Sequence, residues 1–417
     1  MERFEEVCEN STLFFVQQVD SDETGRCSLL LDPHTLDETV RFLARFLGGE
    51  ADASNAEASI IEIDISGKPG QYDDLEGGWF WLDHSLLSEA IVTVVPAAGP
   101  GGLYLRAILT LRPFMDISRY FSTAKAPEIA ERDIIAPNIR APHFHRCSPK
   151  RIRTVLRVID CGHGNWNELE TSASRLLYDV GAGRWFTSEQ VREVVAKRCL
   201  SDEIRDLQIV ISHWDVDHYH AILAFEPDEI SKVKWLMAPS NTPPTATFSR
   251  VEQRLRECFV SVYFLPFAST ESAYIRSGEV SLLPVFTFES WVMLRATSGT
   301  KRNQSGIAMF VAGSRKIGIL SGDHDYSQLL EAVWDTHYWS HRPRTCVLVA
   351  PHHGGHAGQM YADGWLRIFD RIRTPISCGK NRWGHPYPAV LKELYRMQND
   401  DELPWLTKEQ GDYVRVL

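Results

Sequence analysis

From about residue 150 onward, short runs of apolar residues alternate with segments in which apolar positions recur at helical spacing. The runs typical of strands are TVLRVID, RLLYDV, LQIVIS, KWLMA, IAMFVA, KIGILS, TCVLVA and TPISCG. The segments typical of helices include TFSRVEQRLREC, YSQLLEAVW and PAVLKELYRMQ. Strands that are apolar along their whole length are typical of a sheet covered on both faces. The pattern therefore predicts an α/β domain built in layers.

The first 150 residues follow a different pattern. The strand-like runs SLLLD, ASIIEIDIS and LYLRAILTL occur with one amphipathic helix, LDETVRFLARFLGG, whose end is marked by Gly48 and Gly49. The Pro-rich segment at residues 136–150 is typical of a linker. We therefore expect a small α+β domain over residues 1–150, without a catalytic motif, and a second domain over residues 151–417.

Composition narrows the classes of function. The 417 residues carry a formal net charge of -11, which argues against a large basic surface for nucleic acid but leaves room for a local basic groove. The 8 cysteines are scattered without a CxxC pair, which favours reduced, buried thiols. We see neither an apolar signal region at the N-terminus nor a continuous apolar run long enough for a membrane helix. These features predict a cytoplasmic protein.

The stretch ISHWDVDHYH, residues 211–220, places several ionisable side chains directly after a strand-like run. His213, Asp215 and Asp217 alternate, so they can face the same way in an extended loop, and His218 can turn back toward them. Imidazole and carboxylate groups together are typical ligands of divalent transition metals. A polar loop closed by ion pairs is the alternative interpretation.

Three later strand ends carry further side chains able to bind a metal. KIGILSGD ends in Asp323, TCVLVAPHHGG contains His352 and His353, and TPISCG is followed by NRWGHPYP with His385. Sites in open layered sheets commonly lie at strand ends. Several such ends, following HWDVDH in order, favour a metal site over a set of isolated polar loops.

These motifs resemble those of the metallo-β-lactamase fold, and more closely those of the hydrolase domain of ComEC-type DNA-uptake competence proteins. The matching stretches are VIDCGHGNW with LLYDVG, SHWDVDH, NQSGIAMFV with GILSGD, APHHGG and NRWGHPYPAVL. The resemblance implies an α/β fold, the αββα metallo-β-lactamase sandwich, with the α+β domain as an N-terminal addition. It also implies a hydrolase with one or two divalent metal ions. Residues 1–150 lie outside the resemblance and are our candidate for a protein-binding region.

The resemblance assigns roles to individual residues. It implies a first metal position at His213 and Asp215, a second at Asp217 and His218, and a bridging carboxylate at Asp323. It further implies a late metal ligand at His352, with His353 as its alternative, an orienting strand-end residue at Asp179 and a histidine over the substrate side at His385. We expect Asp217 and His385 to act in catalysis. The residues close to His385 that we expect to bind a phosphate are Lys380, Asn381 and Arg382.

Two departures from the family pattern concern the first metal. Asp215 stands where the usual motif has histidine, and no histidine occurs from Ala221 through Asp323, where the usual fold supplies one. A carboxylate is a harder ligand than imidazole, which moves the preference from Zn toward Mn or Mg. We expect Zn or Mn, with Mg as a further candidate. The first site would be weak, empty, or completed by water or His385.

A carboxylate-rich metal site favours attack by a metal-activated water on a phosphodiester, in nucleic acid or a nucleotide. Candidates for a local basic groove are Lys301 with Arg302, Arg315 with Lys316, and Lys380 with Arg382. One alternative is an ester, lactone or amide hydrolase of the same fold. Another is a metal-stabilised, non-catalytic binding subunit of a defence or DNA-processing assembly.

Overall fold

The computed structural model describes residues 10–21, 24–35, 37–38, 42, 58–68, 70–95, 104–113, 115–127, 153–268, 280–288, 290–299, 302–313, 316–335, 345–381, 384–398 and 403–417. The chain forms two compact units. The first comprises Met1–Arg132, Thr187–Gln190 and Thr242–Arg254, and the second comprises the rest. The expected linker at residues 136–150 lies outside the described residues, so a boundary near residue 150 stays a prediction. No helix in the described part of the chain is long and apolar enough to cross a membrane.

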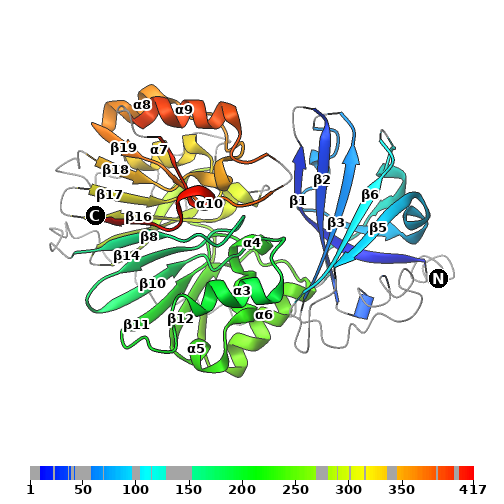
Figure 1. The fold of residues 1–417 in the computed structure, drawn as a ribbon, viewed down its shortest axis with the longest axis horizontal. Coiled ribbons are helices and arrows are strands. Elements are labelled where there is room, and N and C mark those ends of the chain that lie inside the picture. The colour runs from blue at the N-terminus through cyan, green and yellow to red at the C-terminus, as the bar shows by residue number, and fades with distance from the viewer. Residues whose placement is uncertain are drawn as a thin grey trace. The chain divides into compact units, whose positions relative to one another are not determined.

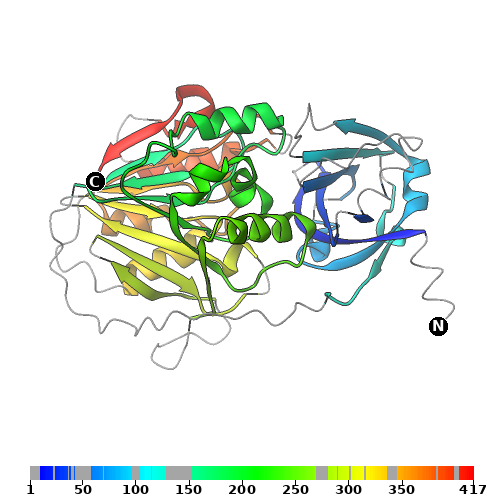
Figure 2. The same cartoon turned by 90° about the horizontal axis from the view of Figure 1, so that it is seen from below.

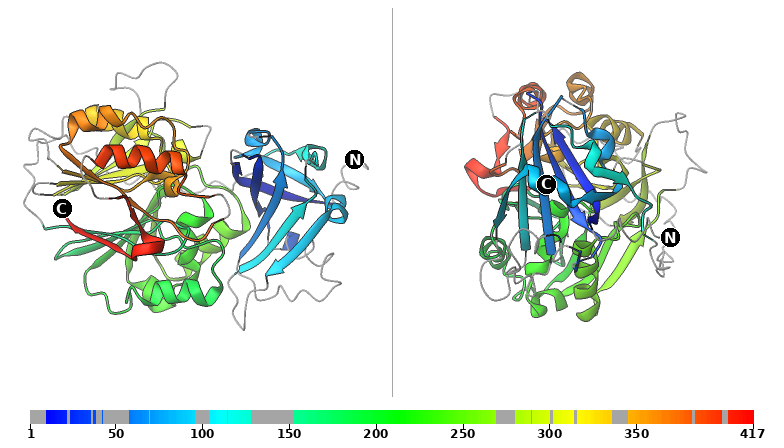
Figure 3. Two further views of the ribbon diagram at one scale, coloured as in Figure 1. Left: turned by 45° about the horizontal axis from the view of Figure 1, so that its top comes forward. Right: turned by 90° about the vertical axis from the view of Figure 1, so that its right-hand side faces the viewer.

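The first unit is built on one seven-stranded sheet with the order β5–β6–β3–β2–β1–β4–β7, drawn in blue to cyan in Figure 3. Ile61, Ile63 and Ile65 of β3 alternate along the strand and are all buried in one apolar core, as expected for a sheet with one covered face. The helix expected at residues 36–49 lies largely outside the described residues. The strands are β1 (Ser11–Ser21), β2 (Arg26–Pro33), β3 (Ala58–Ser66), β4 (Trp79–Asp83), β5 (Ala90–Val95), β6 (Tyr104–Leu111) and β7 (Phe121–Thr123). Short 3-10 helices are η2 (Asp73–Leu75), η3 (His84–Glu89) and η4 (Ser118–Tyr120).

The second unit contains two facing sheets. One has seven strands in the order β13–β12–β11–β10–β9–β8–β22, and the other has six in the order β14–β15–β16–β17–β18–β19. An apolar core with residues from both sheets, including Leu156, Met293 and Met309, fills the space between them. The strands of the first sheet are β8 (Val155–Val158), β9 (Asn167–Glu170), β10 (Ser174–Tyr178), β11 (Asp206–Val210), β12 (Val233–Pro239), β13 (Ser261–Leu265) and β22 (Tyr413–Val416). Those of the second are β14 (Leu282–Phe288), β15 (Trp291–Ala296), β16 (Ile307–Ala312), β17 (Lys316–Leu320), β18 (Thr345–Leu348) and β19 (Arg371–Arg373). A separate pair joins β20 (Pro375–Ile376) to β21 (Trp405–Leu406).

Helices cover the outer face of each sheet in the second unit. Helices α8 and α9 lie over the six-stranded sheet, and α3 and α5 lie over the seven-stranded one (Figures 1 and 2). The α helices are α3 (Ser188–Ala196), α4 (Val216–Tyr219), α5 (Pro227–Ser231), α6 (Ala246–Glu257, divided between the two units), α7 (Tyr326–Asp335), α8 (Ala362–Ile368), α9 (Pro388–Gln398) and α10 (Thr407–Gln410). The 3-10 helices are η5 (His220–Ala224), η6 (Asn303–Ser305) and η7 (Pro351–Gly354). The result is an αββα sandwich, which confirms the predicted fold class.

Parallel pairing of strands brings the loops that carry the candidate metal ligands to one edge of this sandwich. Strands β10 and β11 are parallel neighbours in one sheet, and β17 and β18 are parallel neighbours in the other. Because parallel neighbours end at the same edge, the residues that follow these four strands can meet. Those residues include Asp179, His213, Asp323 and His352.

Candidate metal centre

Asp179, directly after β10, organises the loop that follows β11. Its carboxylate accepts hydrogen bonds from the backbone N of Ser212 at 2.6 Å, from Oγ of Ser212 at 2.8 Å and from Nδ2 of Asn165 at 2.9 Å. The same carboxylate lies 2.9 Å from Nδ1 of His218, an arrangement that fixes the ring and turns Nε2 toward the site. Asp179 is fully buried and has a φ of 60°, a region that Asp and Asn tolerate better than most residues. This position lets Asp179 orient the ring of His218.

Close backbone contacts fix the short helix α4 against the end of β10. A Cβ atom on Gly181 would lie 1.6 Å from the backbone O of Asp217, so only glycine fits there. The backbone N of Asn165 donates to the same oxygen at 2.9 Å, and the backbone N of Val180 donates to the O of His218 at 2.7 Å. The backbone of Asp217 and His218 is thus fixed by the protein itself before any metal binds.

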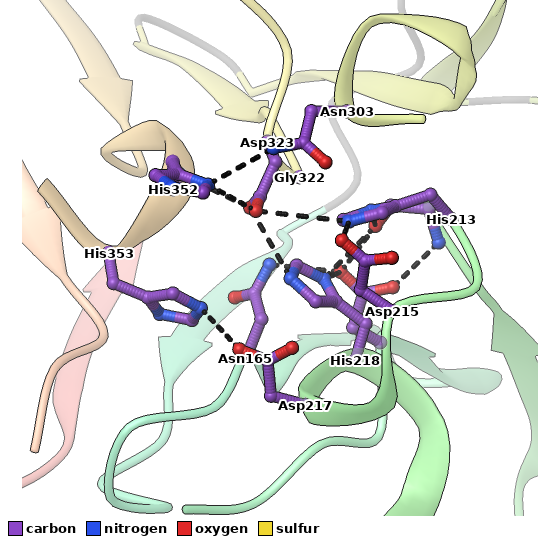
Figure 4. Close-up of polar contacts among 12 residues, drawn as sticks. Asn165, His213, Asp215, Asp217, His218, Asn303, Gly322, Asp323, His352 and His353 are labelled. Atoms are coloured by element: carbon purple, nitrogen blue, oxygen red, sulfur yellow. Dashed lines mark hydrogen bonds and ion pairs between the residues drawn. The ribbon is translucent and has the colours of Figure 1, made fainter. Parts of the chain in front are cut away.

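Within the second unit, two groups of three side chains each bring their ligand atoms within 4.8 Å of one another. One group is His213, His218 and Asp323, and the other is Asp217, His218 and His353 (Figure 4). Nε2 of His218 lies 3.3 Å from Oδ1 of Asp323, and Nε2 of His353 lies 3.2 Å from Oδ2 of Asp217. All five side chains are buried. Imidazoles and carboxylates at these separations fit a divalent ion such as Zn or Mn.

His353 is held so that one ring nitrogen faces the second group. Its Nδ1 lies 2.8 Å from the backbone O of Ser377. A carbonyl oxygen can only accept, so Nδ1 carries the hydrogen and Nε2 presents a lone pair toward Asp217. The residue that sequence reasoning named only as the alternative late ligand is therefore the one that joins Asp217 and His218.

His352 has a different position. Its Nδ1 lies 2.7 Å from Oδ2 of Asp323, and its backbone N donates to Oδ1 of the same carboxylate at 3.2 Å. Both His352 and His353 have positive φ angles, 51° and 54°. Such backbone strain clusters at functional sites. In this geometry, His352 supports the carboxylate that was expected to bridge two metals.

Two buried arginines bind the aspartates of the motif. Nη1 of Arg302 lies 2.6 Å from Oδ1 of Asp215, and Nη2 of Arg184 lies 3.0 Å from Oδ1 of Asp217. Burial by itself raises the pKa of Asp215, but the charges of His213 and Arg302 outweigh it and lower that pKa to about 2. The expectation that Arg302 lines an open basic groove is wrong, because its side chain is only 7% exposed and is bound to Asp215.

The carboxylates of the site outnumber its arginines. Burial acts to lower the pKa of His218, yet Asp323 and Asp179 reverse this and raise it well above its ordinary value. The site therefore attracts positive charge. Its four buried carboxylates and two buried guanidinium groups are Asp179, Asp215, Asp217 and Asp323, and Arg184 and Arg302.

The remaining predicted residues lie on the loop before α9. His385 is buried, and its ring centroid lies 5.3 Å from that of His352. Nδ2 of Asn381 donates to the backbone O of His385 at 2.7 Å, and Oδ1 of Asn381 accepts from the N of His385 at 2.9 Å. The Asn381 amide thus shapes the loop that carries His385. Lys380 is exposed, and Arg382 lies outside the described residues.

Two supporting residues were missed by sequence reasoning. Arg184 is a lone arginine in VGAGRW, and nothing in its spacing links it to Asp217. Asn165 stands in the GHGNW stretch, and its contact with Asp179 was not foreseen. His163 of the same stretch also lies near the site, and its ring centroid lies 4.5 Å from that of His353. Of the other groove candidates, Lys301 and Arg315 lie outside the described residues.

No protein-family model and no curated protein matches this chain. Among solved structures, the metallo-β-lactamase-fold protein YhfI from Bacillus subtilis is similar with a TM-score of 0.36 and 12% identity, over 64% of this chain and 100% of its own. A diphosphatase of the PhnP family is similar with a TM-score of 0.32 and 10% identity, over 63% of this chain and 97% of its own. A long-form RNase Z from yeast is similar with a TM-score of 0.24 and 7% identity, over 75% of this chain and 52% of its own.

The second unit has the metallo-β-lactamase fold. It has the two facing sheets, the outer helices and the histidine and aspartate groups at strand ends that are expected of this fold.

Proposed function

We propose that the second unit is a metal-dependent phosphodiesterase of the ComEC-like type, acting on nucleic acid or a nucleotide. The observation that carries the proposal is the group formed by Asp217, His218 and His353. Each member has a second, buried partner that orients it. These partners are Arg184 for Asp217, Asp179 for His218 and the backbone O of Ser377 for His353. Such outer partners are typical of working metal sites.

When bound, a divalent ion would supply an activated water, whose pKa falls to about 7 on zinc, and an electrophile for a phosphoryl oxygen. The chain's own residues supply the rest. Nε2 of His218 and Nε2 of His353 would hold the ion together with Asp217, and Asp323, held by His352, places Oδ1 3.3 Å from Nε2 of His218. His385, beside His352, is our candidate to give a proton to the leaving oxygen.

The balance of ligand types supports phosphodiesters over carboxylic esters, lactones or amides. Buried carboxylates contribute much of the charge, which suits Mn or Mg and hence phosphate oxygens. Exposed Lys380, close in sequence to His385, is our candidate for attracting a phosphate. Residues 1–150 remain our candidate for binding a protein partner.

The non-catalytic binding subunit is the second candidate function. One observation favours it: arginines bind both Asp215 and Asp217, the two aspartates of the HWDVDH motif. In that case metal would stabilise the fold without turnover.

The test compares untagged wild-type protein with Asp217→Asn. Metal content would be measured after dialysis against Zn, Mn or Mg, and cleavage would be followed on single- and double-stranded DNA, RNA and a small chromogenic phosphodiester. We expect the variant to lose metal and activity by more than about 100-fold, the upper end of what losing an outer partner costs. The matched control is Asp206→Asn, a carboxylate at the other end of β11 whose side chain is 54% exposed.

Three outcomes separate the candidates. Cleavage that falls with Asp217→Asn and survives Asp206→Asn supports the enzyme. Metal bound at Asp217 without cleavage of any phosphodiester supports the binding subunit. Cleavage or metal content equal in wild type and Asp217→Asn would reject the proposed site.

A further inference from the structure

Asp215, one of the two residues expected to hold a first metal, is bound by a buried arginine side chain. Nη1 of Arg302 lies 2.6 Å from Oδ1 of Asp215 and donates to the backbone O of Trp214 at 2.9 Å. The side chains of Arg302 and Asp215 are only 7% and 2% exposed. A guanidinium group stays protonated in proteins and offers no lone pair to a metal. Arg302 therefore supplies a fixed positive charge where a metal ligand would be needed.

The other oxygen of Asp215 is also engaged. Oδ2 lies 3.2 Å from Nε2 of His213. Among the described residues, no group of three potential ligands within 4.8 Å of one another includes Asp215. Arg302 and η6 belong to the segment between Ala221 and Asp323, in which no histidine occurs. This segment therefore brings an arginine, and no histidine, to Asp215. The group of His213, His218 and Asp323 shares His218 with the group that contains Asp217, and because Asp179 engages Nδ1 of His218, only Nε2 is left to bind an ion. The two groups therefore do not fit two ions at once.

The second group has the opposite character. Oδ1 of Asp217 forms an ion pair with Arg184, and Oδ2 of Asp217 faces His353. Nδ1 of His218 contacts the carboxylate of Asp179, and Nε2 of His218 faces Asp323. One atom of each residue is used for orientation and one faces the shared space. This is the donor arrangement expected of a metal site.

Charge balance points to the same number of ions. With an ion in place of the proton on His218 and the other histidines neutral, four buried carboxylates face two buried guanidinium groups. The excess of two negative charges matches one divalent cation. A second divalent ion beside Arg302 would place three positive charges around Asp215, which repel one another in a buried setting.

We infer that this protein holds a single divalent ion, bound by Asp217, His218 and His353, and that Arg302 replaces the first metal as a built-in cation on Asp215. The inference rests on the proposed metal site and specifies its occupancy. Arg302 is a positioning residue, since it contacts Asp215 and would act on the ion only through the charge it supplies.

The experiment counts ions in the untagged full-length protein by native mass spectrometry and elemental analysis after titration with Mn or Zn. Wild type is expected to bind one ion per chain, and bound Mn is expected to give the electron paramagnetic resonance spectrum of an isolated ion. Arg302→His removes the guanidinium and supplies the missing imidazole, so it is expected to bind two ions with a spin-coupled spectrum. Arg302→Lys keeps the charge and is expected to stay at one ion.

Each result decides the inference. Two ions in the wild type, or a count that stays at one in folded Arg302→His, would overturn it and leave the proposed metal function standing. No ion in the wild type would overturn both. If Arg302→His fails to fold, the wild-type count and the wild-type Mn spectrum still decide whether the centre holds one ion or two.

Discussion

The two ends of the parallel strands β10 and β11 hold buried charge in different ways. Near the amino end of β10, Arg175 lies between two glutamates, 2.8 Å from Oε2 of Glu168 and 3.3 Å from Oε2 of Glu203. Arg205 also binds Glu203, at 2.7 Å. Two arginines thus match two glutamates. At the carboxyl end, the buried carboxylates exceed the arginines by two.

This difference separates a structural ion-pair network from a binding site. Buried charges that are paired one to one compensate each other inside the fold and need no added ion. An unmatched excess of negative charge in a buried place is costly unless a cation joins it. The excess of negative charge therefore favours a cation-binding site at the carboxyl end, and each of the following changes tests one of the two ends.

The largest effect is expected at the amino end, from Arg175→Met. The substitution leaves Glu168, whose side chain is 1% exposed, without its cation. Breaking a buried pair by removing one partner should lower the free energy of unfolding by about 3–5 kcal/mol. Urea unfolding measures this loss, and the folded variant should keep the metal content of wild type.

Arg205→Met is the matched control for that change. The Arg205 side chain is 26% exposed, and Glu203 keeps its contact with Arg175. The expected cost is within about 1 kcal/mol, as for surface pairs. An equal loss of unfolding free energy in the two variants, or a loss of metal in Arg175→Met, would contradict the view that the amino end is structural and the carboxyl end binds the cation.

A smaller effect is expected at the carboxyl end, from Asp179→Asn. Asparagine keeps the shape and tolerates the positive φ of this position, but it binds Nδ1 of His218 less strongly than a carboxylate does. Losing such an outer partner should weaken metal affinity by roughly 10–100-fold. Calorimetric titration with Zn or Mn measures the change, with Asp206→Asn beside it as a carboxylate change on the same sheet. An affinity equal to wild type would mean that Asp179 does not orient the site.

The fold was predictable wherever apolar runs are long. IAMFVA coincides with β16 and ASIIEIDIS with β3, because a continuous apolar run and an alternation of apolar and polar residues are both local signals of a strand. NELE, which forms β9, gives no such signal. Its Glu168 is buried only because Arg175 on the neighbouring strand binds it, and that pairing is a tertiary effect that propensity does not contain.

The site was predictable to the level of residue types but not of contacts. His213, Asp217, His218 and Asp323 stand in recognisable strand-end motifs and come together in the structure. The partner of Asp215 could not be foreseen, because Arg302 is 87 residues away along the chain. Long-range pairing of this kind depends on the assembled sheets.

The smallest effect is expected from Lys234→Ala, also toward the amino end of the seven-stranded sheet. Lys234 of β12 lies 2.7 Å from Asp206 of β11, a distance similar to that between Arg175 and Glu168, but the side chains of Lys234 and Asp206 are 59% and 54% exposed. Water already solvates both charges, so losing the pair should change the free energy of unfolding by less than about 1 kcal/mol. Urea unfolding at low and high salt measures it, and the small difference should shrink further as salt screens the pair. A loss as large as that of Arg175→Met would show that pair distance, rather than burial, determines how much these ion pairs stabilise the fold.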